Sequence, residues 1–344
     1  MNRFSLTSPR VYVPLGLVVI LFVIPLVMRN PIFLHLMILI FFYAYLTLSW
    51  NIVGGFAGQV SLGHTAFTGI GAYTSTLLFI QLGLTPWIGM FAGAFLAALM
   101  AVIIGYPCFK LRGAYFALST IGFLEAFRIV VENTNEVFGI PIKGAQGMEV
   151  PLRGDSLLYF QFLDKEPYYY IILVMMFVAL YITYRISKSK FGYYLLAIKN
   201  DLEAAESLGV NIAHSKLKAA AISGFLTGIG GTFYAQLILF IDPANIIGAY
   251  LAFEIVFIAV IGGRGTLLGP ILGSFLLVPV SELTRVYLGG TYFGVHLIVF
   301  GAMLIIVMLF LPRGINDPVL KIYHWVIKKL ERKGSHALGG VASR

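Results

Sequence analysis

The sequence has one cysteine and few charged residues. Cys108 is the single cysteine in 344 residues, which excludes an intrachain disulfide and a cysteine-based metal cage. Charged residues make up 11% of the chain, whereas soluble domains carry about 25%. This shortage of charge argues against a soluble globular protein, and we interpret Cys108 as a packing residue.

A second absence concerns nucleotide binding. The chain has 37 glycines, yet no glycine is followed directly by lysine. A loop that holds ATP phosphates needs Gly-Lys followed by Ser or Thr. We therefore expect no bound cofactor and no catalytic residues on this chain, and we find no pattern of a hydrolase triad or a metal site. If the chain serves active transport, either ATP is hydrolysed on another chain or an ion gradient drives the process.

Long apolar runs fill the chain instead, and hydrophobic residues make up 59% of it. Runs of about 20 apolar residues can cross a hydrocarbon core of about 30 Å. In lipid the backbone must satisfy its hydrogen bonds within each segment, so these runs are predicted to be helices. The predicted fold is an all-α integral membrane protein, a polytopic helical bundle of about ten spans. The spans cover residues 11–28, 33–51, 61–81, 86–107, 114–133, 167–186, 216–240, 246–262, 268–288 and 293–311. The third is rich in glycine and polar residues and is expected to be broken or re-entrant.

The distribution of charge predicts the topology. With a cytosolic N-terminus and alternating spans, most of the 24 Lys and Arg residues fall on the cytosolic side, as the positive-inside rule requires. The net charge of +9 is then a topology signal rather than a sign of nucleic-acid binding. We predict a transmembrane domain over residues 1–315, with an external loop at 133–166 and a cytosolic loop at 187–215, and a basic cytosolic tail over 316–344. The external loop is either a solvated connector or a docking surface or lid, and the tail has the pattern of an interfacial amphipathic helix.

Two glycine-rich motifs stand out, one from Asn51 to Tyr73 and one from Gly262 to Pro270. In membranes, glycines let helices approach closely or let a broken segment line a cavity. Polar residues at membrane depth in the first motif favour a pathway role over packing alone. The predicted pathway residues of the two motifs are Asn51, Gly58, Gln59, Ser61, His64, Gly263 and Gly265.

Ionisable residues within the spans are functional candidates by default. Glu125 and Arg128 are three residues apart, as are Glu282 and Arg285, and for both pairs we favour mutual neutralisation between helices. Glu254 lies in the middle of a span without an evident local partner, so it joins the pathway candidates.

The cytosolic loop contains Glu203-Ala204-Ala205 and, after three intervening residues, Gly209. Asn200 or Asp201 can cap a short helix here, and Gly209 can end it. A short capped helix that projects from the membrane is predicted to act as a rigid peg; the alternative is a simple amphipathic connector.

The same residues carry a family resemblance. The Glu-Ala-Ala-x-x-x-Gly pattern resembles the first half of the loop by which ABC importer permeases hold their ATPases, although the later apolar-Leu-Pro element is missing, with Ala219, Ala221 and Ile222 in its place. The two glycine motifs and the segment from Leu111 to Ala117 add to this pattern. Together they resemble the LivM-type permeases of branched-chain amino acid ABC importers over about Leu36 to Pro312.

The resemblance implies a non-enzymatic subunit of the bacterial plasma (inner) membrane, and the charge distribution predicts that both termini are cytosolic. Its implied partners are a second, LivH-like permease, two cytosolic ATP-binding subunits that use the ATP, and an extracytoplasmic binding protein. It implies the import of Leu, Ile, Val or related small amino acids or amides. It also implies that Glu203, Ala204, Ala205 and Gly209 couple the chain to the ATPase.

Two other classes of function remain open at the level of the sequence. A self-sufficient secondary transporter or channel would need a coupling-ion site built from the few membrane charges, and the peg would then have no purpose. An integral-membrane enzyme would need clustered polar catalytic residues at an interface, and the sequence offers no such cluster. Neighbouring genes for an ATPase and a binding protein would favour the importer.

Overall fold

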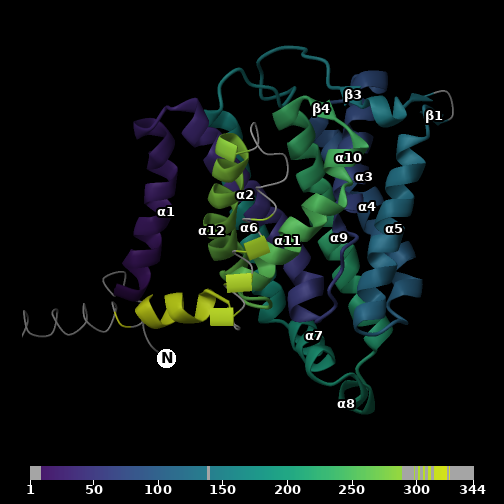
Figure 1. Ribbon diagram of the computed structural model, residues 1–344, viewed down its shortest axis with the longest axis vertical. Helices are drawn as coiled ribbons and strands as arrows, with labels where there is room; N and C mark the ends of the chain where they lie inside the picture. The colour runs from purple at the N-terminus through teal and green to yellow at the C-terminus, as the bar shows by residue number, and fades with distance from the viewer. Residues whose placement is uncertain are drawn as a thin grey trace, which may run out of the picture.

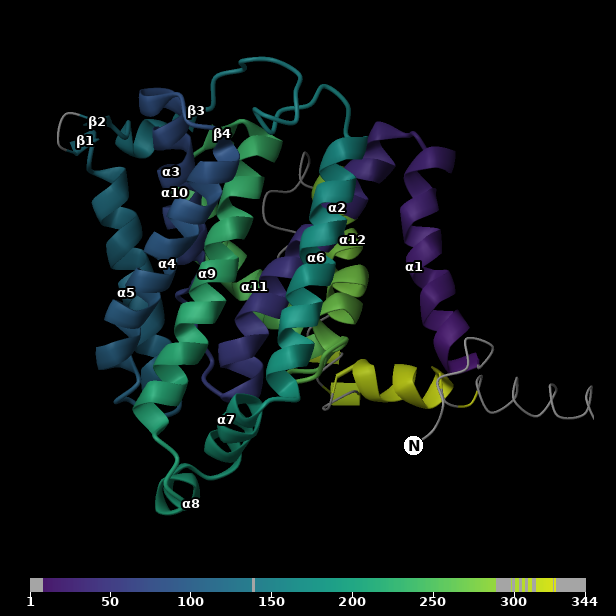
Figure 2. The same ribbon diagram turned by 180° about the vertical axis from the view of Figure 1, so that it is seen from behind.

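The computed structural model describes residues 9–137, 140–288, 298, 301–302, 305–306, 309–310, 314–323 and 325. Its helices lie side by side as a bundle (Figures 1 and 2). They are α1 (Pro9–Val27), α2 (Pro31–Asn51), the π-helical turn η1 (Ile52–Phe56), α3 (His64–Leu82), α4 (Pro86–Cys108), α5 (Ala114–Glu132), the short 3-10 helix η2 (Gly144–Gln146), α6 (Glu166–Ser187), α7 (Lys190–Asn200), α8 (Leu202–Ser207), α9 (Ile212–Ile238), α10 (Pro243–Ile246), α11 (Ala249–Gly262) and α12 (Gly269–Leu288).

Six of the described helical segments are long and apolar enough to cross a membrane. They are Pro31–Phe56, Pro86–Cys108, Ala114–Glu132, Glu166–Ser187, Ile212–Ile238 and Pro243–Gly262. The predicted polytopic helical bundle is therefore confirmed, but the count of about ten spans is not. The predicted first span contains a shorter apolar helix, Leu15–Val27, and the predicted tenth span falls largely outside the described residues.

The two ends of the bundle differ in what they carry. The first residues of α1, the helices α7 and α8, and the helical residues 316–323 lie at one end (Figures 1 and 2). The long connection between α5 and α6 lies at the opposite end. This relative arrangement is the one that the charge pattern predicts. The helical residues 316–323 lie across the end of the bundle (Figure 2), and the domain boundary at residue 315 stays a prediction.

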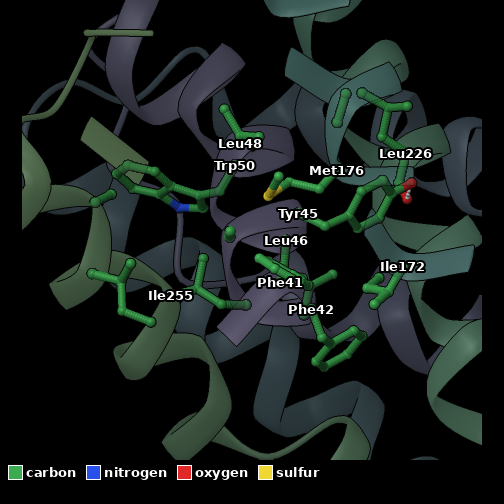
Figure 3. Packing of buried hydrophobic residues seen from close by; sticks show 14 of the residues in the cluster. Phe41, Phe42, Tyr45, Leu46, Leu48, Trp50, Ile172, Met176, Leu226 and Ile255 are labelled. Carbon is green, nitrogen blue, oxygen red and sulfur yellow. Dashed lines mark hydrogen bonds between the residues drawn. The ribbon is translucent and has the colours of Figure 1, made fainter. Parts of the chain in front are cut away.

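Helix α2 forms the apolar centre of the bundle. Every residue from Ile38 to Asn51 is buried except the partly exposed Tyr43, and Figure 3 shows the large side chains of this helix packed against those of α6, α9 and α11. The Tyr45 hydroxyl, which is polar, donates a hydrogen bond of 2.6 Å to the carbonyl of Leu226. A buried hydroxyl needs such a partner, so this bond fixes α2 against α9.

Helices α3, α4 and α9 pack almost backbone to backbone. A Cβ atom added at Gly93 would lie 2.8 Å from the carbonyl oxygen of Gly71, and one added at Gly228 would lie 2.8 Å from the Cβ of Ala97. One added at Gly231 would collide with the backbone of Thr68. Small residues at helix contacts are the usual basis of close packing in membranes. For Gly71 in the first glycine motif, the packing interpretation is therefore confirmed.

The connection between α5 and α6 is folded onto the end of the bundle. Strands β1 (Glu136–Val137) and β2 (Ile140–Pro141) pair antiparallel, as do β3 (Met148–Glu149) and β4 (Phe240–Ile241). The buried ring of Phe160 stacks on Trp87 with 4.4 Å between the ring centroids. The guanidinium of Arg153 lies 4.4 Å from the ring centroid of Phe79. These contacts make the connection a packed cap rather than a loose solvated connector.

Candidate functional site

A non-helical segment, residues 57–63, interrupts the bundle between η1 and α3. The indole Nε1 of Trp50 donates to the carbonyl of Ser61 at 2.7 Å, and the amide of Leu62 donates to Oγ1 of Thr120 at 3.0 Å. The amide of Gln59 donates to the carbonyl of Val53 at 3.1 Å. Irregular backbone at membrane depth is tolerated only where protein or a cavity surrounds it. The predicted third span is not broken internally: α3 runs without interruption from His64 to Leu82, and the break precedes it at residues 57–63.

The His64 ring links three helices through two serines. Its Nδ1 lies 3.1 Å from Oγ of Ser61, and its Nε2 lies 2.8 Å from Oγ of Ser223. Because the Ser223 hydroxyl already donates to the carbonyl of Ser49 at 2.7 Å, Nε2 must be the donor to Ser223. In a neutral ring the proton is then on Nε2, and Nδ1 accepts from Ser61. Beside it, His64, Cys108 and other residues line a cavity of about 30 Å³, enough for one water molecule.

Asn51 joins the two glycine motifs. Its side chain is fully buried, its Oδ1 accepts from the amide of Gly265 at 2.9 Å, and its Nδ2 donates to the carbonyl of Thr266 at 2.8 Å. The motifs also touch through their backbones, because a Cβ at Gly55 would lie 2.7 Å from the amide nitrogen of Gly265. Two segments more than 200 residues apart in the sequence thus form one junction at the end of the bundle that carries α7.

Lys199, in the last turn of α7, covers this glycine junction. A Cβ at Gly58 would lie 3.0 Å from Cγ of Lys199, and one at Gly265 would lie 2.7 Å from its Nζ. Both glycines have positive φ, +72° and +81°, a conformation that other residues rarely adopt. Partial burial lowers the pKa of Lys199, and the like charge of Arg264 lowers it further. The predicted pathway glycines therefore contact the helix that leads to the peg.

The sequence suggested that Glu254 has no local partner, but the structure shows partners for its carboxylate. Its carboxylate accepts hydrogen bonds from Tyr43 at 2.5 Å, from Tyr250 at 3.0 Å and from Ser281 at 3.1 Å. The prediction failed because two of these donors come from other helices, α2 and α12, and only Tyr250 lies one turn away. A buried carboxylate with three donors holds α2, α11 and α12 together.

The predicted peg is confirmed as a short helix, α8, although Lys199 and Asn200 belong to α7. The Asp201 carboxylate caps α8 by accepting from the amides of Glu203 and Ala204, both at 3.0 Å. Gly209 has a φ of +81° and follows the helix end. Ala205 is buried within this chain, and its coupling role stays a prediction. Its methyl group anchors the peg from inside.

Helix α5 is little buried overall and carries a cluster of partly buried charged side chains. Only 17% of the residues in its most apolar stretch are buried, against 72% for α2 with η1. Arg128 pairs with Glu125 at 2.7 Å and with Glu132 at 2.5 Å. The predicted pairing of Glu125 with Arg128 is confirmed, and Glu132 joins it, but the pair is not enclosed between helices of this chain. The other predicted pair, Glu282 and Arg285, also forms, at 2.7 Å.

Comparison with known proteins adds sequence relatives to this geometry. The family described as "Branched-chain amino acid transport system / permease component" matches residues 32–308. The chain belongs to this family. It is 30% identical over 307 residues to the high-affinity branched-chain amino acid transport permease LivM of Escherichia coli, covering 83% of this chain and 71% of LivM. No solved structure matches the chain.

More distant relatives are also transport permeases. The chain is 25% identical over 288 residues to the permease LivH of Salmonella typhimurium, covering 79% of this chain and 90% of LivH. It is 25% identical over 200 residues to the nucleoside ABC transporter permease NupC of Lactococcus lactis, covering 53% of this chain and 60% of NupC. The chain is therefore a multi-pass membrane permease subunit, and the alternative of a self-sufficient secondary transporter or channel is not favoured.

One surface residue of the permease escaped the sequence analysis. Leu208, directly after α8, has 83% of its surface exposed. It stands inside the predicted Glu203–Gly209 pattern, but a single leucine carries no positional signal in the sequence. An exposed leucine beside a capped helix, outside the apolar bundle, gives the tip of the peg an apolar contact residue.

Proposed function

We propose that this permease forms, with a second LivH-like permease, the translocation pathway of an ATP-driven importer for branched-chain amino acids or related small amino acids and amides. Two cytosolic ATP-binding subunits hydrolyse the ATP, and an extracytoplasmic binding protein delivers the substrate. The chain lies in the bacterial plasma (inner) membrane with both termini in the cytosol. The positive-inside distribution of Lys and Arg supports this orientation.

The observation that carries the proposal is the tip of α8. Asp201 caps the helix. Ala205 is buried on its inner side, and the exposed Leu208 follows its last residue. Burying exposed apolar surface against a protein partner is favourable. The tip therefore has the form of an apolar peg that inserts into a pocket on the ATPase.

The route from the peg to the membrane runs through α7. Lys199 contacts both glycine loops at its end, and Asn51 holds those loops together. A displacement of α8 by the ATPase is transmitted along α7 to the ends of α2 and α11. We assign Gly58, Gly263 and Gly265 to this connection between α7 and the membrane helices. In this proposal they do not line an open pore. Gln59, Ser61 and His64, on the adjoining non-helical segment, remain the proposed pathway residues.

The pathway itself is proposed to lie against α5. A charged cluster on a little-buried helix is expensive in lipid, so the face with Arg128 is expected to meet the second permease or the substrate. Arg128 with two carboxylates offers partners for both ends of a zwitterionic amino acid.

Co-purification tests the peg. The permease carries a tag, and the Leu208→Asp variant is compared with Leu163→Asp, since Leu163 is 85% exposed but lies in the cap at the opposite end. We expect Leu208→Asp to lose the ATPase subunit and ATP-driven uptake of labelled Leu, Ile and Val, while Leu163→Asp keeps the ATPase. Retention of the ATPase by both variants at the parent level would place the docking surface elsewhere.

A further inference from the structure

A basic groove opens beside α8 at the end of the bundle that carries α7. It has a volume of about 660 Å³ and is lined by the last turn of α4, the residues after it, α8 and the first turn of α9. Lys110, Arg112 and Lys216 supply its positive charge, and Glu206 is the carboxylate among its lining residues.

Lys216 is the unusual member of this basic groove. It is 2% exposed, and among the described residues no carbonyl or carboxylate accepts a hydrogen bond from its ammonium. Its described contact is the ring of Phe109, whose centroid lies 5.9 Å from Nζ. Removing an ammonium from water costs several kcal/mol unless an opposite charge compensates. No described carboxylate pairs with Lys216, so an anion bound in the groove would compensate its charge.

The start of α9 points to the same need. Asn211 caps the helix by accepting from the amide of His214 at 2.9 Å. Ile212 and Ala213 line the basic groove, and their backbone amides have no acceptor within the described part of the chain. Free amides at the start of a 27-residue helix, together with the helix dipole, favour an anion such as a phosphate.

The rim of the groove indicates where the anion comes from. Tyr106, in the last turn of α4, is 61% exposed, and Nζ of Lys110 lies 5.1 Å from its ring centroid. The groove thus lies where two membrane-length helices have their ends, and an exposed aromatic ring lies on its bundle side. Aromatic residues at helix ends are typical of a membrane interface. Basic pockets between helix ends at the cytosolic surface suit anionic lipid headgroups.

We propose that this basic groove binds the phosphate of an anionic phospholipid, with Lys216 and the amides of Ile212 and Ala213 around the phosphate and Arg112 at the rim. Arg112 also reaches Glu203 on α8 at 3.3 Å. A bound lipid would therefore touch the peg through Arg112 and make ATPase docking sensitive to the charge of the membrane.

Native mass spectrometry of the full-length permease, purified and delipidated in detergent, tests the site without ATP or transported substrate. The protein is titrated with phosphatidylglycerol and with phosphatidylcholine of the same acyl chains. We expect one site that prefers phosphatidylglycerol. Lys216→Gln and Arg112→Gln should each weaken it by about tenfold, the loss expected for one charged hydrogen bond. Lys218→Gln, on the exposed side of α9, is the matched control and should bind like the parent.

Four results would overturn the assignment. Equal binding of the two lipids would contradict a lipid site, and so would unchanged binding by both groove variants. Because Arg112 is exposed, Arg112→Gln keeps the fold even if Lys216→Gln does not. Binding of inorganic phosphate that phosphatidylglycerol does not displace would indicate a free-phosphate site. Loss of ATPase co-purification in Lys216→Gln, without any lipid preference in the parent, would assign the groove to a carboxylate of the ATPase. Because lipid binding is measured on the permease alone, failure of the peg proposal leaves this result intact.

Discussion

Replacing Gly265 by alanine tests the glycine junction under Lys199. Gly265 and Gly209 share a φ of +81°, so alanine at either position carries a left-handed strain of about 1–2 kcal/mol. The two sites differ in their surroundings. A Cβ at Gly209 meets nothing within 4 Å, whereas a Cβ at Gly265 would lie 2.7 Å from Nζ of Lys199 and 2.9 Å from the carbonyl oxygen of Gly55.

This difference gives the expected magnitudes. Overpacking adds about 1–3 kcal/mol, so Gly265→Ala should lower the free energy of unfolding by about 2–5 kcal/mol. Gly209→Ala should lower it by about 1–2 kcal/mol. Adding Lys199→Ala to Gly265→Ala should restore only part of the loss, because the carbonyl of Gly55 remains in place.

The measurement is denaturant titration of the purified permease in mixed micelles, followed by far-UV circular dichroism, with uptake measured in parallel. Gly265→Ala should also lose uptake, because the junction connects α7 to the ends of α2 and α11. Equal losses of stability in the two variants, together with normal uptake by Gly265→Ala, would refute a close contact at this position.

Three further variants probe other parts of the site. Asn51→Ala should lower the free energy of unfolding by about 1–3 kcal/mol in the same titration, because it removes two hydrogen bonds to the partly buried backbone of Gly265 and Thr266; the exposed helix cap Asn30→Ala should cost about 1 kcal/mol. Lys199 has a lowered pKa in the folded chain, so the unfolded chain binds more protons between that pKa and 10.5. Stability should therefore rise with pH across this interval, and Lys199→Met should flatten the rise in unfolding measured as a function of pH. Arg128→Gln should reduce uptake at least about tenfold with assembly intact. Arg285→Gln, which breaks the other charged pair, should not reduce uptake in this way. Equal uptake by the two variants would place the pathway away from α5.

The sequence was sufficient for features that depend on local spacing. Hydropathy located the long helices, and the spacing of Asp201 and Gly209 delimited α8, because a cap and a helix end are set by a few adjacent residues. The pair Glu125 and Arg128 followed from the three-residue spacing on one helix.

Features that depend on contacts between distant helices were missed. Two of the three donors of Glu254, Tyr43 and Ser281, lie on other helices, and the inward position of Ala205 depends on how α8 folds back. The two glycine motifs meet at Asn51, which joins α2 to the loop after α11. No local sequence pattern predicts that contact. For the same reason, the shallow burial of α5 could not be read from its composition, which resembles that of enclosed helices.

The glycine packing of α3, α4 and α9 has a mechanical consequence. Where Gly71, Gly93, Gly228 and Gly231 bring backbones into contact, no flexible side chains separate the helices to absorb sliding. Packed elements of this kind move as one rigid body, and rotation is left to the segments without helical hydrogen bonds. In this permease such hinges are available at residues 57–63 and 263–268, and both adjoin the junction covered by Lys199. A push at the tip of α8 therefore arrives at the points where the bundle can bend.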